Sequence, residues 1–175
     1  MADKLNAFHI DLNELAIKEK LIVERDMERD TLIADDAKLS RRVHQIIRQK
    51  GQVQNIIIDG HYATDVVPIE KITKVFVLRR NPKELEKLMR KRGYKGRKIW
   101  ENLAAEILDI CLDDALRSVS VGKVCEIDVT GKGTDEVANE VVSILNNSKP
   151  CTVGIVDWLG KLEREESLDA FLKEF

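Results

Sequence analysis

An acid and a histidine follow one short apolar run near the middle of the chain. The run is NIIIDGH, residues 55–61, in which three isoleucines lead directly to Asp59, Gly60 and His61. A buried parallel strand delivers the side chain that ends it to the carboxyl edge of a sheet, where open α/β sheets bind their ligands. Such a strand gives an acid little structural reason to follow it, which predicts that Asp59 is a functional acid. His61 has two interpretations, a role beside phosphate or in a Mg²⁺ hydration shell, and capping of the loop.

Arginines cluster at another strand end and in a break between two helices. Arg79 and Arg80 follow the strand VFVL, so at least one of them is predicted to meet phosphate; the alternative is that one pairs with a carboxylate on the next helix. The stretch RKRGYKGRK, residues 90–98, contains six cations and two glycines. It is either a solvated basic turn or a mobile lid whose guanidinium groups neutralise a transferring phosphoryl group. These residue types favour phosphoryl transfer.

A phosphate loop would complete such a site. It requires Gly-x-x-x-x-Gly-Lys-Ser/Thr, because backbone N–H groups must point at the phosphates while the lysine and hydroxyl reach the terminal phosphate and Mg²⁺. The 175 residues do not contain this motif. In the nearest approach, GIVDWLGKL at residues 154–162, five residues separate the glycines and Leu162 stands where the hydroxyl should be. Packing is the better interpretation of that segment.

Strands and helices alternate around these candidate residues. Apolar runs at residues 7–12, 55–60, 72–80 and 122–129 predict buried strands. Amphipathic stretches predict helices over residues 35–50, 81–92, 98–117 and 134–147. In the second helix, Asn81 is placed to cap, Pro82 to occupy the first turn and Glu84 to complete a capping box. This order of elements predicts an α/β fold with a parallel sheet and right-handed crossovers.

Composition limits the architecture and the class of partner. With 175 residues and 43% hydrophobic residues, the chain can bury one ordinary core, predicted at residues 1–148, with an extension at 149–175 packed on it. The 29 basic and 31 acidic side chains nearly cancel, so no strong bulk affinity for nucleic acid is expected. No apolar stretch approaches the ~20 residues that span a bilayer, which predicts no membrane partner. Cys111, Cys125 and Cys151 are scattered, so reduced core thiols, no structural metal and a cytoplasmic location are expected.

Several of these motifs, taken in order, resemble one known family. The string DGHYATDVVP, then VFVLRRNP, then LMRKRGYKGRKIWENLAAEI looks like the CINAP-type adenylate kinases, nucleoside-monophosphate kinases tied to small-ribosomal-subunit assembly. FHIDLNELAIKEKL and the following ERDTLIADDAKL resemble the family's monophosphate-binding region, and VGIVDW resembles the tail of archaeal members. The resemblance covers nearly the whole chain. It implies the three-layer fold of P-loop nucleoside-monophosphate kinases.

The resemblance also implies roles for particular residues. Asp59 matches the acid that orients Mg²⁺ through water, and His61 is the histidine of the same motif. Arg92 matches the lid arginine that contacts ATP, within a lid at residues 91–101, and Lys132 matches a lysine near the ATP base. Arg79 would lie near the transferring group. Residues 11–34 would form the monophosphate-binding segment, including Asp11, Asn13, Glu14, Arg29 and Asp30.

Other polar and aromatic residues are assigned structural or alternative roles. Tyr94 and Trp100 are expected either to stack on a base or to pack the lid. His9 and His44 are expected to be surface or partly buried structural residues.

The sequence departs from the family at its start. Family members open with a strand, the phosphate loop and a first helix, whereas MADKLNAF aligns with the end of that helix. The opening strand would lie between the strands ending at Asp59 and Arg79, so a chain without it is expected to leave buried backbone groups unpaired or to rearrange. Either Met1 is a misassigned start, with the loop encoded in frame upstream, or catalysis has been lost.

These two explanations give two functions. The first is an ATP- and Mg²⁺-dependent kinase that phosphorylates AMP or a related nucleoside monophosphate, with a possible ATPase activity in ribosome maturation. The second is a catalytically inactive homologue that holds a small-subunit ribosomal protein as an assembly module. The sequence fixes neither the preferred monophosphate nor the ribosomal partner.

Overall fold

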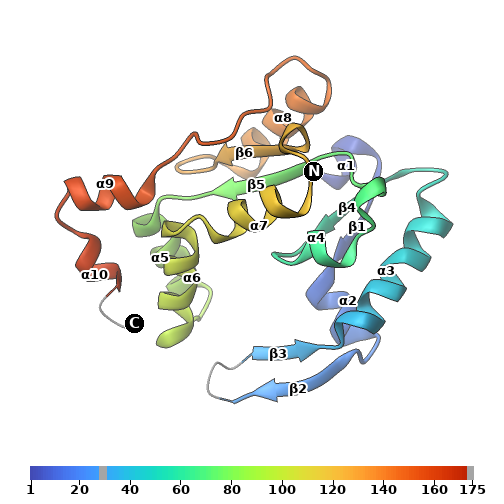
Figure 1. Ribbon diagram of the computed structural model, residues 1–175, viewed down its shortest axis with the longest axis horizontal. Coiled ribbons are helices and arrows are strands. Elements are labelled where there is room, and N and C mark those ends of the chain that lie inside the picture. Colours follow the sequence, from blue (N-terminus) through green and yellow to red (C-terminus); the bar gives the residue numbers. More distant parts are fainter. Residues whose placement is uncertain (28–30, 173–175) are drawn as a thin grey trace. The chain divides into compact units, whose positions relative to one another are not determined.

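A computed structural model describes residues 1–27 and 31–172 of the chain (Figure 1). The chain forms two compact units: Met1–Thr73 with Ala138–Ser148, and Lys74–Val137 with Lys149–Phe175. The boundary at residues 148 and 149 coincides with the predicted start of the C-terminal extension. The domain division at 1–148 and 149–175 otherwise stays a prediction.

The first unit is built around a pair of parallel strands. Its elements are α1 (Ala2–Leu5), β1 (Ala7–Asp11), α2 (Leu12–Lys18), β2 (Ile22–Asp26), β3 (Thr31–Ala34), α3 (Asp36–Lys50), β4 (Asn55–Asp59), α4 (Ala63–Val66) and η1 (Ile69–Lys71). β1 and β4 run parallel, in a register that pairs Ala7 with Asn55 and Asp11 with Asp59. The carboxyl ends of the two strands therefore coincide, and each ends on an aspartate.

Helix α3 shows why this unit folds as the sequence predicts. The Asp35 side chain accepts a hydrogen bond from the Lys38 backbone N–H at 3.0 Å and so caps the helix. Leu39, Val43 and Ile46 lie on one face, and all three are buried in a core cluster with residues of β1 and α2. Each such side chain stabilises the fold by about 1.5–3 kcal/mol relative to exposure.

A hairpin lies within the predicted monophosphate-binding segment, where the sequence pattern did not indicate strands. β2 and β3 pair antiparallel, with an irregularity between Ile22 and Glu24. Figure 1 shows the pair as a two-stranded ribbon. Val23 and Met27 on this hairpin are 61% and 79% exposed, so the strands lack the strong apolar alternation that would have predicted them. Arg29 and Asp30 lie outside the described residues.

The second unit contains the other parallel pair. Its elements are β5 (Val75–Arg79), α5 (Pro82–Lys91), α6 (Arg97–Ile107), α7 (Ile110–Ser118), η2 (Val121–Lys123), β6 (Val124–Asp128), α9 (Trp158–Arg164) and α10 (Leu168–Leu172). β5 and β6 are parallel from Val75 opposite Val124 to Arg79 opposite Asp128. Helix α8 (Thr134–Leu145) begins in this unit and continues in the first.

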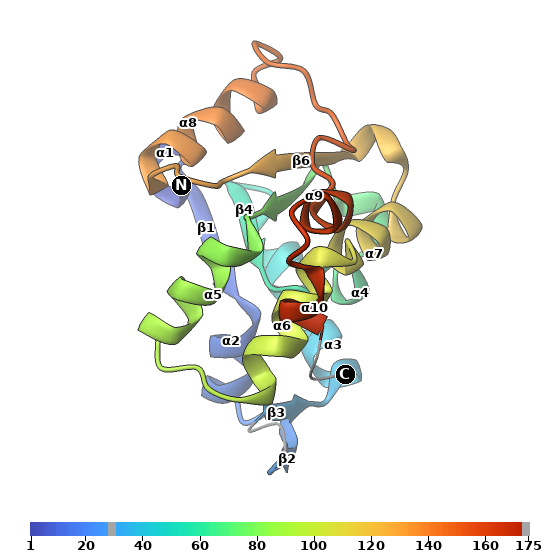
Figure 2. The same ribbon diagram turned by 90° about the vertical axis from the view of Figure 1, so that its left-hand side faces the viewer.

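The C-terminal segment packs on helices α5 and α6, two elements of the second unit. Leu162 of α9 and Phe171 of α10 are buried in a core cluster with Met89, Ile99, Leu103 and Ile107. Figure 2 shows α10 beside α6. The apolar WLGKL stretch is therefore helical core, as the packing interpretation of that segment predicts, with Asp157 accepting a hydrogen bond from the Gly160 N–H at 2.7 Å.

The helix predicted over residues 98–117 is wrong as a single element. Helix α6 ends at Ile107 and α7 begins at Ile110. Asp109 between them adopts a left-handed conformation with φ 58°. Its carboxylate pairs with the Arg79 guanidinium, so a tertiary ion pair supports the break that the apolar periodicity does not show.

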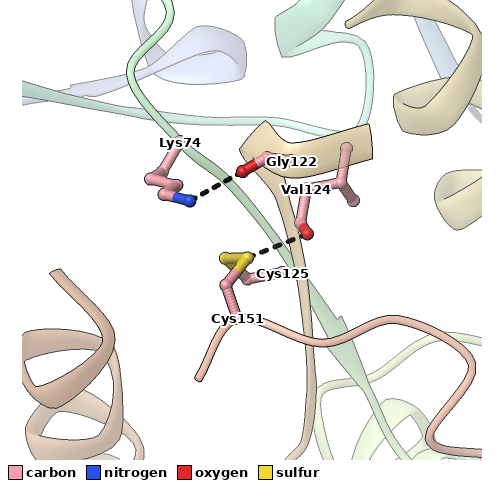
Figure 3. The surroundings of a disulfide bond; sticks show 5 residues. All are labelled: Lys74, Gly122, Val124, Cys125 and Cys151. Atoms are coloured by element: carbon pink, nitrogen blue, oxygen red, sulfur yellow. Dashed lines mark hydrogen bonds between the residues drawn. A yellow bond between two sulfur atoms is a disulfide. The ribbon is translucent and has the colours of Figure 1, made fainter. Parts of the chain in front are cut away.

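The expectation of three reduced core thiols is wrong. Cys125 and Cys151 form a disulfide between β6 and the start of the C-terminal segment (Figure 3). The Glu126 N–H donates to the Thr152 carbonyl at 2.8 Å, so the segment runs beside β6 and brings the two sulfurs together. Nearby, Lys74 Nζ donates to the Gly122 carbonyl at 2.8 Å (Figure 3). Cys111 is a free, exposed cysteine.

The predicted α/β class with parallel strands and covering helices is confirmed, but the four parallel strands are divided between two separate sheets. In the described part of the chain, β1 pairs with β4 and β5 with β6, and β4 and β5 belong to different sheets. No helix among residues 1–27 and 31–172 is long and apolar enough to cross a bilayer.

Candidate functional site

The candidate residues of the first unit gather at the carboxyl end of β1 and β4. Asp11 and Asp59 are register partners there, and Asp59 is exposed. Gly60, next along the chain, has φ +156°, and a Cβ on it would lie 2.8 Å from Leu12 Cδ1. Glycine is therefore required for the chain to turn away from the strand so close to α2, and the turn leaves the Asp59 side chain at the surface.

Asp11 begins helix α2 and fixes its first turn. Its carboxylate accepts hydrogen bonds from the backbone N–H groups of Asn13 at 2.8 Å and Glu14 at 3.0 Å. The side chains of Asn13 and Glu14 are exposed at the same strand end. The structure therefore places three predicted monophosphate-binding residues together, beside Asp59, while their role in binding stays a prediction.

Tyr62 joins this group, although the sequence pattern did not single it out. Its hydroxyl donates to Asn13 Oδ1 at 3.2 Å. Burial, together with the negative charges of Asp36 and Asp11, raises the pKa of Tyr62, so the hydroxyl stays a proton donor at neutral pH. His61 is exposed and its ring lies edge-on to Tyr62 with centroids 4.7 Å apart. The adjacency of Tyr62 to Asp59 and His61 was the one available signal.

Arg79 in the second unit is held by carboxylates. Its guanidinium donates to Glu106 Oε1 at 2.9 Å and to Glu126 Oε1 at 2.5 Å, and it pairs with Asp109. The Arg79 side chain is only 2% exposed. The guanidinium nitrogens of Arg79 are thus occupied by protein carboxylates. Contact of Arg79 with phosphate stays a prediction, and this arrangement does not support it.

Three acids around one guanidinium make a cluster with excess negative charge. Burial raises the pKa of Glu106 above its ordinary value, although the charge of Arg79 and the hydrogen bonds from Arg80 and Trp158 act to lower it. The pKa of Arg79 is raised although burial opposes its charge, because Glu106 and Asp109 attract the proton. The raised pKa of Arg79 means that its guanidinium stays charged, and the raised pKa of Glu106 means that this carboxyl group is protonated more easily than an ordinary one.

Arg80 pairs with a carboxylate on the next helix, which was the alternative to contact with phosphate. Its guanidinium pairs with Glu84, a carboxylate on helix α5, and its backbone N–H donates to Glu106 Oε1 at 3.0 Å. The Arg80 side chain is 21% exposed. Both side chains are therefore already paired with carboxylates of the protein, which does not support the first interpretation, contact of Arg79 or Arg80 with phosphate.

The basic stretch forms the end of α5, a short loop and the start of α6. Arg92 is exposed, and its backbone N–H completes the last turn of α5. Gly93 and Gly96 have φ +87° and +53°, in the left-handed region that glycine adopts without strain. Arg90 pairs with Glu86 at 2.7 Å and Arg97 with Glu101 at 2.9 Å, so both flanks are held by ion pairs on their own helices.

The aromatic residues of the predicted lid separate into two environments. Trp100 packs against the core cluster that contains Leu162, which matches the packing interpretation. Tyr94 is 39% exposed, and Lys98 Nζ lies 5.6 Å from the centre of its ring. His9 is exposed and His44 is partly buried beside Ser40 Oγ at 3.3 Å, as expected of structural histidines.

Lys132 lies in the turn after β6. Its side chain is half-buried, and its backbone N–H donates to the Val129 carbonyl at 3.2 Å. The turn follows the carboxyl end of the β5–β6 pair, the position at which parallel sheets bind ligands. Arg92 and Lys132 therefore both belong to the second unit, while Asp59 belongs to the first.

Comparison with known proteins identifies the family of this chain. A family model described as an AAA domain matches residues 1–109. "Putative adenylate kinase" of Methanocaldococcus jannaschii is 35% identical over 161 residues, which are 92% of this chain and 84% of that protein. The protein of the same name in Pyrococcus furiosus is 32% identical over 158 residues, 90% and 81% of the two chains. The one in Methanosarcina acetivorans is 35% identical over 144 residues, 79% and 72%.

The parallel α/β fold, with acids at its strand ends, is of the nucleoside-monophosphate-kinase-like class. Within that class, the chain belongs to the archaeal adenylate-kinase-like family. The family expected from the sequence motifs is thereby confirmed, and the relatives support a nucleotide-kinase-like function.

Proposed function

We propose that this protein is a nucleoside-monophosphate kinase that transfers the γ-phosphoryl group of ATP to AMP or a related monophosphate. The observation that carries the proposal is the pair of acids, Asp11 and Asp59, in register at one carboxyl edge of a parallel pair. The relatives named as adenylate kinases support the substrates ATP and AMP.

The acids present suit a hydrated Mg²⁺ ion. Mg²⁺ keeps several waters and binds through one or two carboxylates together with substrate phosphates, without an all-protein cage. In the described ranges, no group of three His, Cys, Asp or Glu side chains could hold a metal ion by itself. An exposed Asp59 beside Asp11 fits an acid that orients the ion's water. When bound, Mg²⁺ would neutralise charge on the β- and γ-phosphates.

In the proposed reaction an oxygen of the monophosphate forms a bond to the γ-phosphorus as the bond to the β,γ-bridging oxygen breaks, giving two diphosphates from ATP and AMP. Asp11, Asn13 and Glu14 would hold the monophosphate, and Arg92 would neutralise charge on the transferring group. His61 would stand beside phosphate or the hydrated cation. No residue is assigned as a covalent nucleophile.

The cellular role is proposed from the family resemblance alone. A small-subunit ribosomal protein would be the partner, with ATP hydrolysis coupled to ribosome maturation in the cytoplasm. The kinase and ATPase reactions would use one site and differ only in whether a monophosphate or water accepts the phosphoryl group.

The test is ADP formation from ATP, AMP and MgCl₂, measured for the 175-residue chain and for a protein translated from the nearest in-frame start upstream. Asp59→Asn is expected to lower turnover about 10²- to 10³-fold, since it removes an electrostatic group at the reacting charges. Asp3→Asn, an exposed acid of α1, is the matched control and should retain parental turnover. AMP binding without ADP formation in either parent would instead favour the binding module, and parental activity of Asp59→Asn would remove Asp59 from the mechanism.

A further inference from the structure

The start of the C-terminal segment is irregular and is attached to strand β6. Residues 149–157, which we call the strap, contain no helix or strand, and Figure 1 shows them as a coil that leads into α9. Besides the disulfide, the strap meets β6 through the Glu126 N–H, which donates to the Thr152 carbonyl at 2.8 Å. Glu126 Oε2 in turn accepts the Ile155 N–H at 2.9 Å. The disulfide is the covalent part of this attachment.

The two halves of the disulfide differ in their access to a reductant. Cys125 is fully buried, whereas Cys151 is partly exposed. Cys151 Sγ also lies 3.0 Å from the Val124 carbonyl oxygen (Figure 3). A disulfide has no S–H to donate, but a thiol is a weak hydrogen-bond donor, so a reduced Cys151 has an acceptor already in place. The site therefore accommodates both oxidation states.

The helix that follows the strap packs beside the predicted lid at residues 91–101. Leu162 of α9 lies in one core cluster with Met89 of α5 and Ile99 of α6. Met89 comes just before the predicted lid, and Ile99 lies within it. The position of α9 therefore affects the packing at both ends of the lid.

The polar contacts of the strap reach the cluster around Arg79. Glu126 accepts the Ile155 N–H through one oxygen and pairs with Arg79 through the other, and its side chain is 0% exposed. Trp158, which begins α9 and is 5% exposed, donates from Nε1 to Glu106 Oε1 at 2.7 Å. A strap that left β6 would take these donors away from largely buried carboxylates, and water would have to replace them. A change at the disulfide is therefore transmitted to Trp158.

We infer that the Cys125–Cys151 bond is a redox-sensitive latch. In the oxidised state it holds the strap on β6 and so supports the predicted lid; reduction by a dithiol frees the strap and mobilises the lid. A thiolate of the dithiol attacks Cys151 Sγ, the S–S bond breaks, and Cys125 leaves as a thiolate that takes up a proton. The second thiol of the reductant then displaces Cys151 from the mixed disulfide. Two electrons pass to the protein, which gains two thiols, and the reductant ends as a disulfide.

A purely structural disulfide would behave differently. It stabilises a protein mainly by constraining the unfolded chain, so its reduction would lower the unfolding free energy and leave the native state as it was. A latch changes the native state itself, in the absence of denaturant, and the change reverses on oxidation. Measurements on the native protein therefore separate the two roles.

The first measurement follows the fluorescence of Trp158 in the native 175-residue protein. Trp100→Phe leaves Trp158 as the one tryptophan. Dithiothreitol is expected to shift the emission to longer wavelength, because the indole leaves Glu106 and becomes hydrated, and oxidised glutathione should reverse the shift. Cys111→Ser in the same background is the control and should respond fully, since Cys111 is a free cysteine. Cys151→Ser should show the reduced spectrum with either reagent.

Amide exchange followed by NMR measures the effect on the lid in the parent, without a tryptophan substitution. Reduction should accelerate exchange about tenfold or more at Glu126, at Ile155 and in residues 93–99, as expected where a local contact is lost. Amides of β1 and β4 should keep their rates, because these strands belong to the first unit.

Three results would overturn the inference. The first is unchanged fluorescence and amide signals in a native protein whose Cys125 and Cys151 are shown to be reduced. The second is a bond that excess dithiothreitol does not reduce in the folded protein. The third is unfolding of the second unit on reduction, because a latch requires a folded reduced state.

The effect of the latch on catalysis rests on the proposed function, whereas the latch itself does not. At saturating AMP, kcat/KM for ATP is expected to fall about tenfold on reduction and to recover on oxidation, because a mobile lid closes less often. Cys151→Ser should keep the lower value with either reagent. A chain that forms no ADP but shows the fluorescence and amide changes retains the latch and loses the kinase proposal. An active kinase with equal kcat/KM in both states would overturn the link between strap and lid.

Discussion

At the scale of single residues, the same residue type serves opposite purposes depending on what surrounds it. Arg79 is buried among three carboxylates and organises the interior of its unit, whereas Arg92 projects from the end of α5 with its side chain exposed. An exposed guanidinium can meet a phosphate without first breaking an ion pair. Of these two arginines, Arg92 is therefore the one whose predicted contact with phosphate the arrangement of side chains leaves open.

Arg92→Ala is expected to lower kcat for phosphoryl transfer by about 10³-fold or more, because a closing arginine contributes mainly in the transition state. Its unfolding free energy should change by less than about 0.5 kcal/mol, as for a typical exposed substitution. Steady-state kinetics and urea unfolding measure the two effects. Arg90→Ala, which removes a guanidinium paired with Glu86, is the control. Equal kcat in Arg92→Ala and the parent would exclude Arg92 from the mechanism.

Glu106 provides a pH-dependent contribution whose sign follows from its raised pKa. Above the ordinary value of 4.5, and up to the raised value, the folded state holds a proton that the unfolded state releases. The contribution of Glu106 is therefore fully present below the ordinary pKa and is lost as pH rises through the raised one. In Glu106→Gln this loss should disappear.

The measurement is the unfolding free energy from urea titrations between about pH 4 and 8, in the parent and in Glu106→Gln. The amide oxygen can still accept from Arg79, Arg80 and Trp158, which keeps the packing comparable. Identical slopes of unfolding free energy against pH in the two proteins would show that Glu106 titrates as an ordinary carboxyl.

At the scale of elements, the C-terminal segment belongs to the structure of the second unit. It is joined to β6 by the disulfide, Trp158 Nε1 donates to Glu106 Oε1 at 2.7 Å, and the Ile155 N–H donates to Glu126 Oε2 at 2.9 Å. Glu126 and Glu106 thereby connect the segment to Arg79. The disulfide and these hydrogen bonds therefore all hold the stretch of chain from Cys151 to Trp158.

Reduction of the disulfide should lower the unfolding free energy of the second unit by about 2–4 kcal/mol, the usual value for a loop of this size. The Cys125 and Cys151 positions are 26 residues apart. Denaturation followed by tryptophan fluorescence, with and without reductant, measures the loss. Cys151→Ser should match the reduced parent and be insensitive to reductant, while Cys111→Ser should behave as the parent. No effect of reductant on the parent would contradict the role given to this bond.

At the scale of the whole molecule, each unit has its own core cluster. The first contains Leu12, Leu39 and Val43, and the second contains Ile99, Leu103 and Leu162. The two clusters share no residue. Over the whole chain, the 29 basic and 31 acidic side chains nearly cancel, so the expectation of no strong bulk affinity for polyanions stays a prediction.

Leu39→Ala is expected to destabilise the first unit by about 2–5 kcal/mol, since Leu39 is fully buried and alanine leaves a cavity. Amide exchange should accelerate in β1, α3 and β4, while β5, β6 and α6 keep their protection, because local stability follows the core that each element packs on. Hydrogen exchange read by mass spectrometry tests this pattern, with Ile99→Ala as the converse variant. Uniform acceleration along the chain would show one cooperative core.

Much of this fold could be predicted from local patterns. The strands ending at Asp59 and Arg79, helix α3 with its buried face, and Asn81 at the start of α5 all follow from periodicity and capping, which depend on neighbours in the chain. The motifs also identified the family. The carboxyl-edge position of Asp11 and Asp59 needed only the parallel order of the strands.

Tertiary structure alone decided what each polar side chain meets. The sequence could not show that Asp109 pairs with Arg79 at a break between two helices. It also could not show that Glu84 accepts a hydrogen bond from the Gly131 N–H in place of completing a capping box, or that Cys125 forms a disulfide with Cys151. The partners are 30 positions apart for Asp109 and Arg79, 47 for Glu84 and Gly131, and 26 for the two cysteines. Such contacts form only when folding brings strand ends, turns and the C-terminal segment together. Periodicity determines which face of an element is buried; the identity of a polar partner depends on three-dimensional proximity, which local sequence does not encode.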